Sequence, residues 1–213
     1  MPKTLTRMAA ALALTMAAAT SQAAIVELVT NGGFETGDLT GWNSIASPTQ
    51  SNSASAVNPS SGSFSLNMFN QDGGTALLMQ QTVGAGLLTS GQEITVSFDL
   101  RGTTANSALL FVELLSLGAG PASLDLNGPY FGGADPNAWT NYTFTTNVGA
   151  DISGGLLIQL NAPCGAVAGC LNDIYIDNFS ITADVVPIPA AVWLFGSALL
   201  GMGGLSRKLK KAA

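Results

Sequence analysis

The chain has 213 residues, of which 47% are hydrophobic and only 9% are charged, and it contains 25 Gly and no His. The apolar residues form separate short runs, which is typical of a packed fold with many turns and excludes a disordered chain. All thirteen acidic residues but only one of the seven basic residues, Arg101, lie in residues 24–184, giving this segment a net charge of −12. Because nucleic acids are bound mainly through Lys and Arg, this charge excludes a nucleic-acid partner, whereas it suits hard cations such as Ca²⁺.

The first segment has the layout of a secretory signal peptide. Two basic residues precede an apolar run from residue 8 to residue 19, and small residues follow it. We expect residues 1–23 to be a signal helix, with cleavage after Ala23 or Ala24. The alternative is a helix of the core, which the polar Thr-Ser-Gln segment after the run disfavours.

Residues 24–184 show the periodicity of β-strands. Apolar and polar residues alternate in QEITVSFDL (residues 92–100) and in NYTFTTNV (141–148), as half-buried antiparallel strands require. SALLFVELLSL (107–117) is apolar on both faces and predicts a central strand. Further strands are expected in FSLNMF (64–69), TALLMQQTV (75–83), GGLLIQL (154–160) and NDIYIDNFSI (172–181). Long amphipathic helices are missing from this segment, so we predict an all-β antiparallel sandwich, most simply a jelly roll.

The segment SPTQSNSASAVNPSSGS (residues 47–63) is rich in Ser, Asn and Pro. It is either a linker between two domains or a long surface loop that carries one short strand. The segment before it is too short to hold a core, which favours the loop.

Two motifs, one at each end of this body, resemble those of a known family. NGGFETGDLTGW (residues 31–42), taken as the first strand, and NDIYIDNFSI, taken as the last, resemble the galactose-binding-like jelly rolls. Within that group they are most similar to the non-catalytic carbohydrate-binding modules attached to bacterial xylanases and glucanases. The pieces SGSFSLNM, ITVSFDLRG and WTNYTFTT follow in the family's order, so the resemblance covers nearly the whole body. It implies association with polysaccharide.

The same resemblance implies a structural Ca²⁺ site. In these modules the Glu of the "FE" step and the Asp of the "DN" step hold the ion, and here they match Glu35 and Asp177. Backbone carbonyls of Asn31 or Gly33, and of residues 62–65, are candidates to complete the site.

The residues of the last strand give evidence for this site that is independent of the resemblance. The apolar positions change parity at Asp177, which predicts a β-bulge with an acidic side chain between buried neighbours. Such a carboxylate needs a partner, and a cation with oxygen ligands is one solution. The alternative is that Glu35 caps a turn and Asp177 accepts backbone N–H bonds.

Sugar binding in such modules uses exposed aromatic faces. Tyr130 and Phe131 lie in the turn-rich segment LNGPYFGGADPN (residues 126–137) and are expected to be exposed in a loop, with Trp139 as a further candidate. The alternatives are a loop folded over the edge of the sandwich and, for Trp42 and Trp139, a position that seals the edge of the core.

Cys164 and Cys170 bracket a short Gly-containing segment. In an exported protein this spacing predicts a disulfide bond, because a zinc site needs more soft ligands than two. An enzyme is not expected. Without His there is no Ser-His or Cys-His nucleophile system, and no pair of carboxylates lies in a recognisable glycosidase context.

The C-terminal segment has three parts. Val186, Pro187, Ile188 and Pro189 form a short Pro motif. Residues 188–205 carry no charge and as a helix span about 27 Å, enough for one transmembrane helix. Four basic residues follow, which places that end in the cytoplasm; they are Arg207, Lys208, Lys210 and Lys211.

This order resembles the PEP-CTERM family of bacterial sorting signals in its VPLPA variant, with Ile188 in place of the usual Leu. The resemblance implies export by the secretion machinery, transient anchoring in the inner membrane of a Gram-negative bacterium, and cleavage near the Pro motif by an exosortase. The product would reach the cell surface or the extracellular matrix, leaving residues 185–213 as the sorting signal. The alternative is a permanent anchor. The expected function is association with polysaccharide; the alternative is a structural or adhesive matrix protein without a specific sugar site.

Overall fold

The computed structural model of the chain describes residues 24–131 and 134–185, and for residues 123–131 it describes the backbone alone. The predicted signal helix, Pro motif, membrane helix and basic cluster lie outside these residues. Among the residues that are described, no helix has the length and hydropathy needed to cross a membrane.

The described chain is built from strands. They are β1 (Ala24–Glu27), β2 (Asn43–Ile45), β3 (Ser51–Ser55), β4 (Ser65–Asn70), β5 (Thr75–Val83), β6 (Glu93–Ala105), β7 (Leu110–Leu117), β8 (Ser123–Phe131), β9 (Thr140–Asn147), β10 (Gly155–Cys164) and β11 (Leu171–Val185).

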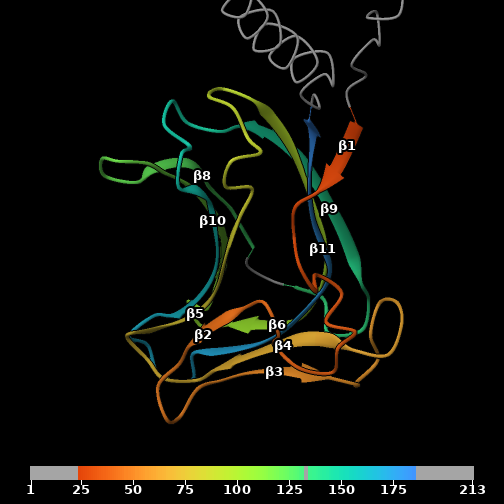
Figure 1. Ribbon diagram of the computed structural model, residues 1–213. Coiled ribbons are helices and arrows are strands. Elements are labelled where there is room, and N and C mark those ends of the chain that lie inside the picture. Colours follow the sequence, from red (N-terminus) through yellow and green to blue (C-terminus); the bar gives the residue numbers. More distant parts are fainter. Residues whose placement is uncertain (1–23, 132–133, 186–213) are drawn as a thin grey trace, which may run out of the picture. The chain divides into compact units, whose positions relative to one another are not determined.

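The strands form two antiparallel sheets within the compact unit Ile25–Asp184 (Figure 1). Sheet A has the order β3-β4-β11-β6-β9, and β1 also pairs with β11. Sheet B has the order β2-β5-β10-β7-β8. The predicted all-β antiparallel sandwich is therefore confirmed.

The core lies between the two sheets. Alternate residues of the inner strands are buried, as in Ile94, Val96 and Phe98 of β6, while the residues between them are half-buried or exposed on the outer face. Phe98 stacks on Phe179 of β11 with ring centroids 5.6 Å apart. Burial of each large apolar side chain contributes about 1.5–3 kcal/mol, so this alternation fixes which face of each strand points inward.

Most of the predicted strands are present. β5 has the predicted bounds, and β7 lies between β10 and β8, as expected of a central strand. Residues 47–63 lie inside the compact unit and carry the short strand β3, so the surface loop is confirmed and the domain linker is wrong.

The predicted bulge in the last strand is also confirmed. The register of β11 with β6 shifts between Asp177 and Ser180, and Asn178 has a φ of 51°. The left-handed backbone at Asn178 places one extra residue in β11, which restores the inward direction for Phe179.

The interpretation of residues 31–42 as a strand is wrong. The segment forms successive turns, with hydrogen bonds from the Phe34 N–H to the Asn31 carbonyl (3.2 Å) and from the Gly37 N–H to the Phe34 carbonyl (3.0 Å). Phe34 is fully buried, and Trp42 is 8% exposed and stacks on it with ring centroids 5.7 Å apart. The apolar residues of this segment thus close the edge of the core, as the alternative for Trp42 predicted.

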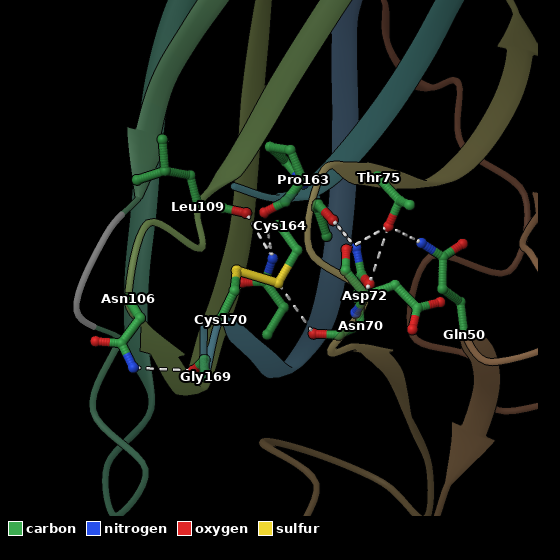
Figure 2. The surroundings of a disulfide bond; sticks show 12 residues. Gln50, Asn70, Asp72, Thr75, Asn106, Leu109, Pro163, Cys164, Gly169 and Cys170 are labelled. Atoms are coloured by element: carbon green, nitrogen blue, oxygen red, sulfur yellow. Dashed lines mark hydrogen bonds between the residues drawn. A yellow bond between two sulfur atoms is a disulfide. The ribbon is translucent and has the colours of Figure 1, made fainter. Parts of the chain in front are cut away.

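The predicted disulfide bond is confirmed. Cys164 and Cys170 are joined by an S–S bond of 2.10 Å, and both are buried (Figure 2). The bond links the end of β10 in sheet B to the start of β11 in sheet A. Next to it, the Asn172 side chain donates hydrogen bonds to the carbonyls of Pro163 (2.8 Å) and Leu109 (3.1 Å). Together these contacts join the two sheets at one end of the sandwich.

Candidate functional site

Asp177, one of the two carboxylates among the predicted metal ligands, lies fully buried at the bulge of β11. One oxygen accepts hydrogen bonds from the backbone N–H groups of Ser60 (2.9 Å) and Ser61 (3.0 Å), and the other accepts one from Asn178 (2.7 Å). Desolvation by burial raises the pKa of Asp177, although these N–H bonds oppose it. The carboxylate therefore fixes the loop before β4 to the bulge.

Glu35, the other carboxylate among the predicted ligands, contacts the same loop. Its carboxylate accepts hydrogen bonds from the backbone N–H groups of Ser63 (3.0 Å) and Phe64 (3.1 Å). Gly62 has a φ of +60°, and a Cβ there would lie within 2.6 Å of both Glu35 oxygens. Glycine is thus required for the loop to approach the carboxylate.

The structure places the Glu35 side chain and the Asp177 carboxylate near the backbone of Gly33. A Cβ on Gly33 would lie 3.7 Å from the Glu35 Cγ and 3.8 Å from the Asp177 Oδ1. The Asn31 carbonyl, another predicted ligand, accepts hydrogen bonds from the Phe34 N–H and from the Trp42 Nε1–H, both at 3.2 Å. The donor set fits Ca²⁺ in kind, since it consists of oxygens. Both carboxylates also accept backbone N–H hydrogen bonds. These are the bonds expected of the alternative role, in which Glu35 and Asp177 hold turns and bind no metal.

The Arg101 side chain packs against Trp139, a residue predicted to bind sugar, on the outer side of sheet A. The Arg101 guanidinium carbon lies 5.2 Å from the centre of the Trp139 ring and 4.3 Å from that of Tyr175. It donates hydrogen bonds to the carbonyls of Val57 (2.9 Å) and Pro136 (3.2 Å). Trp139 is half-buried in this stack and lies on the outer side of the sheet, so it does not seal the core.

The prediction that Tyr130 and Phe131 lie in a loop is wrong. Both residues lie in β8, at the edge of sheet B. Tyr130 lies opposite Phe111 of β7 and Phe131 opposite Leu110. The Pro and Gly residues that suggested a loop are tolerated here because an edge strand leaves one row of its N–H groups unpaired. The structure therefore places Tyr130 and Phe131 in β8 of sheet B, whereas Trp139 directly precedes β9 of sheet A.

The outer face of sheet B carries a row of polar side chains that the sequence did not indicate. Gln80 of β5, Gln159 of β10 and Glu113 of β7 lie directly opposite one another in the register. The Gln80 amide donates a hydrogen bond to the Gln159 carbonyl oxygen, and the Gln159 amide donates one to Glu113. We call these three residues the polar row. All three are half-buried, and the three strands span about 10 Å.

A second row lies two residues further along the same strands. It consists of Leu78, Asn161 and Phe111, which are also opposite one another and half-buried. Tyr130 continues this row in the register of β8. An aromatic ring beside amide and carboxylate groups is the combination that contacts both the C–H faces and the hydroxyl groups of a sugar.

The register explains why sequence reasoning missed this face. The strands that carry Gln80, Gln159 and Glu113 were predicted, and the alternation within each strand indicated their outward side. The three residues are, however, separated by dozens of positions in the chain. Only the pairing β5-β10-β7 brings them into one row.

A shallow hollow of about 330 Å³ lies elsewhere, at one end of sheet A. Its lining residues come from β1, β6, β11 and the loop before β6; they are Ile25, Gln92, Glu93, Thr95, Thr182, Ala183 and Asp184. None of the predicted site residues contributes to it.

The comparisons with known proteins give the fold. No protein-family model matches the chain, and no curated protein matches it. The CBM22-1 xylan-binding domain from Paenibacillus barcinonensis Xyn10C is 14% identical to it, with a TM-score of 0.54, over 80% of this chain and 99% of that one. TmCBM61 in complex with β-1,4-galactotriose is 17% identical, with a TM-score of 0.52, over 75% and 99%.

A further similar structure is the enzymatically active domain of tailspike protein 4 of bacteriophage CBA120. It is 19% identical, with a TM-score of 0.54, over 73% of this chain but only 21% of that one. The chain therefore spans about a fifth of that protein. At these identities the likeness shows the fold alone, which is a β-sandwich like those of carbohydrate-binding modules.

Proposed function

We propose that this protein binds polysaccharide through the outer face of sheet B and has no catalytic activity. The observation that carries the proposal is the polar row, bordered by Phe111 on the same face. The likeness in fold to a xylan-binding domain and to a galactotriose-binding module supports it.

The chemistry of this face suits a sugar chain. The polar row satisfies part of its own hydrogen-bonding capacity across the strands, which holds the amide and carboxylate groups in fixed directions. Each amide can make further hydrogen bonds, and Glu113 accepts from hydroxyl groups. The ring of Phe111 offers an apolar surface to the C–H face of a sugar. The face thus binds hydroxyl-rich ligands without needing a cation.

The absence of catalysis is part of the proposal. A glycosidase needs two carboxylates on either side of the scissile bond. Among the described side chains of the two rows on this face, Glu113 is the only carboxylate. A single carboxylate within a row of amides supports binding rather than hydrolysis.

A binding assay with a matched pair of variants tests the proposal. Phe111 and Phe69 are both half-buried on an outer face, Phe111 on sheet B and Phe69 on β4 of sheet A. We expect Phe111→Ala to weaken binding to a glycan found on an array by about ten- to thirtyfold, because it removes the apolar platform. Phe69→Ala should leave binding unchanged. Equal loss in both variants, or no glycan bound on the array, contradicts the proposal and favours a structural or adhesive role.

We propose further that Ca²⁺ binds between Glu35 and Asp177, with the carbonyls of Asn31 and Gly33 as additional ligands. The closeness of the Glu35 side chain and of the Asp177 carboxylate to Gly33 supports this site. Calorimetric titration with Ca²⁺ should give heat and raise the melting temperature, and Asp177→Asn should abolish both effects. Asp151 is the matched control, since it too accepts backbone N–H bonds, from Ala119 (2.9 Å) and Ser153 (3.2 Å). If Ca²⁺ gives no heat and no thermal shift with the wild-type chain, the calcium site is contradicted, and Glu35 and Asp177 only hold turns.

For localisation we propose export through the signal peptide, followed by transient anchoring in the inner membrane of a Gram-negative bacterium. Cleavage by an exosortase near Pro187 would then release the body to the cell surface or extracellular matrix. The support is the order of the Pro motif, the uncharged run and the basic cluster. Mass spectrometry of the extracellular protein should find the chain without residues 188–213. An extracellular chain that retains Arg207 to Lys211 contradicts sorting by cleavage.

A further inference from the structure

The four edge strands of the two sheets differ in how well they are protected against pairing with another strand. An edge strand exposes unpaired N–H and C=O groups, and proteins protect such edges with short strands, Pro, charged residues or bulges. In sheet B, β2 has only three residues. β8 contains Asp125 and Pro129, and its register with β7 is irregular at two places. Both edges of sheet B are therefore protected.

The two edges of sheet A are unequal. β3 has five residues, and its Asn52 side chain donates hydrogen bonds to the Leu78 carbonyl (2.9 Å) and the Ser44 hydroxyl (2.9 Å) of sheet B. β9 has eight residues, TNYTFTTN, without a charge or a Pro. Its register with β6 runs without a shift from Thr140 to Asn147, and within the described chain β6 is the strand it pairs with. None of the usual protections is found in β9.

The charge of the protein makes this edge a place where two copies can meet. Residues 24–184 carry a net charge of −12, so most of their surface repels a second copy. β9 is neutral, and its outward side chains are Asn141, Thr143, Thr145 and Asn147. β9 is a long, regular and uncharged strand in an otherwise acidic protein. Its unpaired edge therefore fits an identical strand better than a charged partner.

The sequence of β9 is also complementary to itself. If two copies pair antiparallel with Thr143 opposite Thr143, every residue faces one that points to the same side of the sheet. Tyr142 of one copy then lies opposite Phe144 of the other, twice, on the inward side. Asn141 lies opposite Thr145 on the outward side. Aromatic cross-strand pairs stabilise sheets, and no like charges come together.

We propose that two copies of this protein associate through their β9 strands, joining their A sheets into one continuous sheet about a two-fold axis. The contact is self-complementary and closes at a dimer. It leaves the outer face of sheet B free, so it is independent of the proposed polysaccharide binding.

Charge exchange at Thr143 tests the dimer. The full-length chain should be a dimer by light scattering after gel filtration, whereas Thr143→Glu and Thr143→Lys should each weaken association at least tenfold, because like charges meet at the axis. Mixing the two variants should restore the dimer, which also shows that both are folded. Ser53→Glu and Ser53→Lys are matched controls, since Ser53 is exposed on the outer face at the opposite edge of the same sheet.

A monomeric wild-type chain overturns the proposal. So does a dimer that persists in both Thr143 variants, or one that Ser53→Glu disrupts equally. A failure of the mixture to associate, while the separate variants have the circular dichroism of the wild type, also contradicts pairing at Thr143. Polysaccharide binding by the Thr143 variants is expected to match that of the wild type, which keeps the two proposals separately testable.

Discussion

Two buried charged side chains of sheet A and the polar row of sheet B make different kinds of contact. On sheet A, Arg101 and Asp177 hydrogen-bond the backbone of loops that are distant in the chain. On sheet B, Gln80, Gln159 and Glu113 hydrogen-bond one another from strand to strand. A side chain that holds a loop contributes to stability, whereas a row that orders itself presents its remaining groups to a ligand. Substitutions on sheet A should therefore lower stability, and substitutions on sheet B should lower affinity.

The largest expected loss of stability is at Arg101. This side chain is 8% exposed, stacks between Trp139 and Tyr175, and donates to two loop carbonyls. Arg101→Ala should lower the free energy of unfolding by about 2–4 kcal/mol, because it removes these contacts and leaves the carbonyls unpaired. Urea unfolding measures this change. A loss of glycan affinity without loss of stability would reverse the roles assigned to the two sheets.

The disulfide bond should have the next largest effect. Cys164 and Cys170 are six positions apart, so the bond closes a short loop. By lowering the entropy of the unfolded chain, it raises the free energy of unfolding by about 2 kcal/mol. The double variant Cys164→Ala/Cys170→Ala should unfold at a lower temperature than the wild type, yet still bind glycan. Adding a reductant should lower the melting temperature of the wild type alone. If the reductant affects both proteins equally, the bond is not the cause.

On sheet B the expected pattern is the opposite. Gln159 lies at the centre of the polar row and bonds to both of its neighbours. Gln159→Ala should weaken glycan binding by about tenfold, which corresponds to one or two hydrogen bonds. Its free energy of unfolding should change by no more than about 0.5–1 kcal/mol, since the side chain is on a partly solvated face. Affinity electrophoresis and urea unfolding of the same preparation give the two numbers.

The smallest effect concerns pH. Asp99 is partly desolvated, which acts to raise its pKa, but hydrogen bonds from Asn141, Asn178 and Ser60 outweigh this and lower it. Because the pKa of Asp99 in the folded chain lies below its ordinary value of 3.8, Asp99 stabilises the fold above that pH. This contribution is lost as the pH falls through the lower, folded value. Asp99→Asn should therefore flatten the fall in melting temperature on acidification; an unchanged pH profile contradicts this role.

Much of the fold could be predicted from local patterns. The alternation in β6 and β9 and the parity change at Asp177 both follow from the two-residue period of a strand. Residues 31–42 could not be predicted in this way. Phe34 and Trp42 are apolar for the same reason as strand residues, namely burial, but turns rather than a strand bring them to the core.

Less of the candidate site could be predicted, because it depends on which strands are neighbours. Glu35 and Asp177 were placed by short motifs, and the structure brings them to one loop. The polar row depends on the pairing of β10 with β5 and β7, which no local pattern encodes. The Pro and Gly neighbours of Tyr130 predict a loop, although an edge strand tolerates both residue types.

Binding of polysaccharide by the outer face of sheet B can be measured in one affinity electrophoresis experiment. Wild type, Phe111→Ala and Phe69→Ala run in gels with and without the polysaccharide that the array identifies. If the outer face of sheet B binds polysaccharide, the polysaccharide retards the wild type and Phe69→Ala equally and has little effect on Phe111→Ala. Retardation of all three alike, or retardation lost in Phe69→Ala instead, contradicts it.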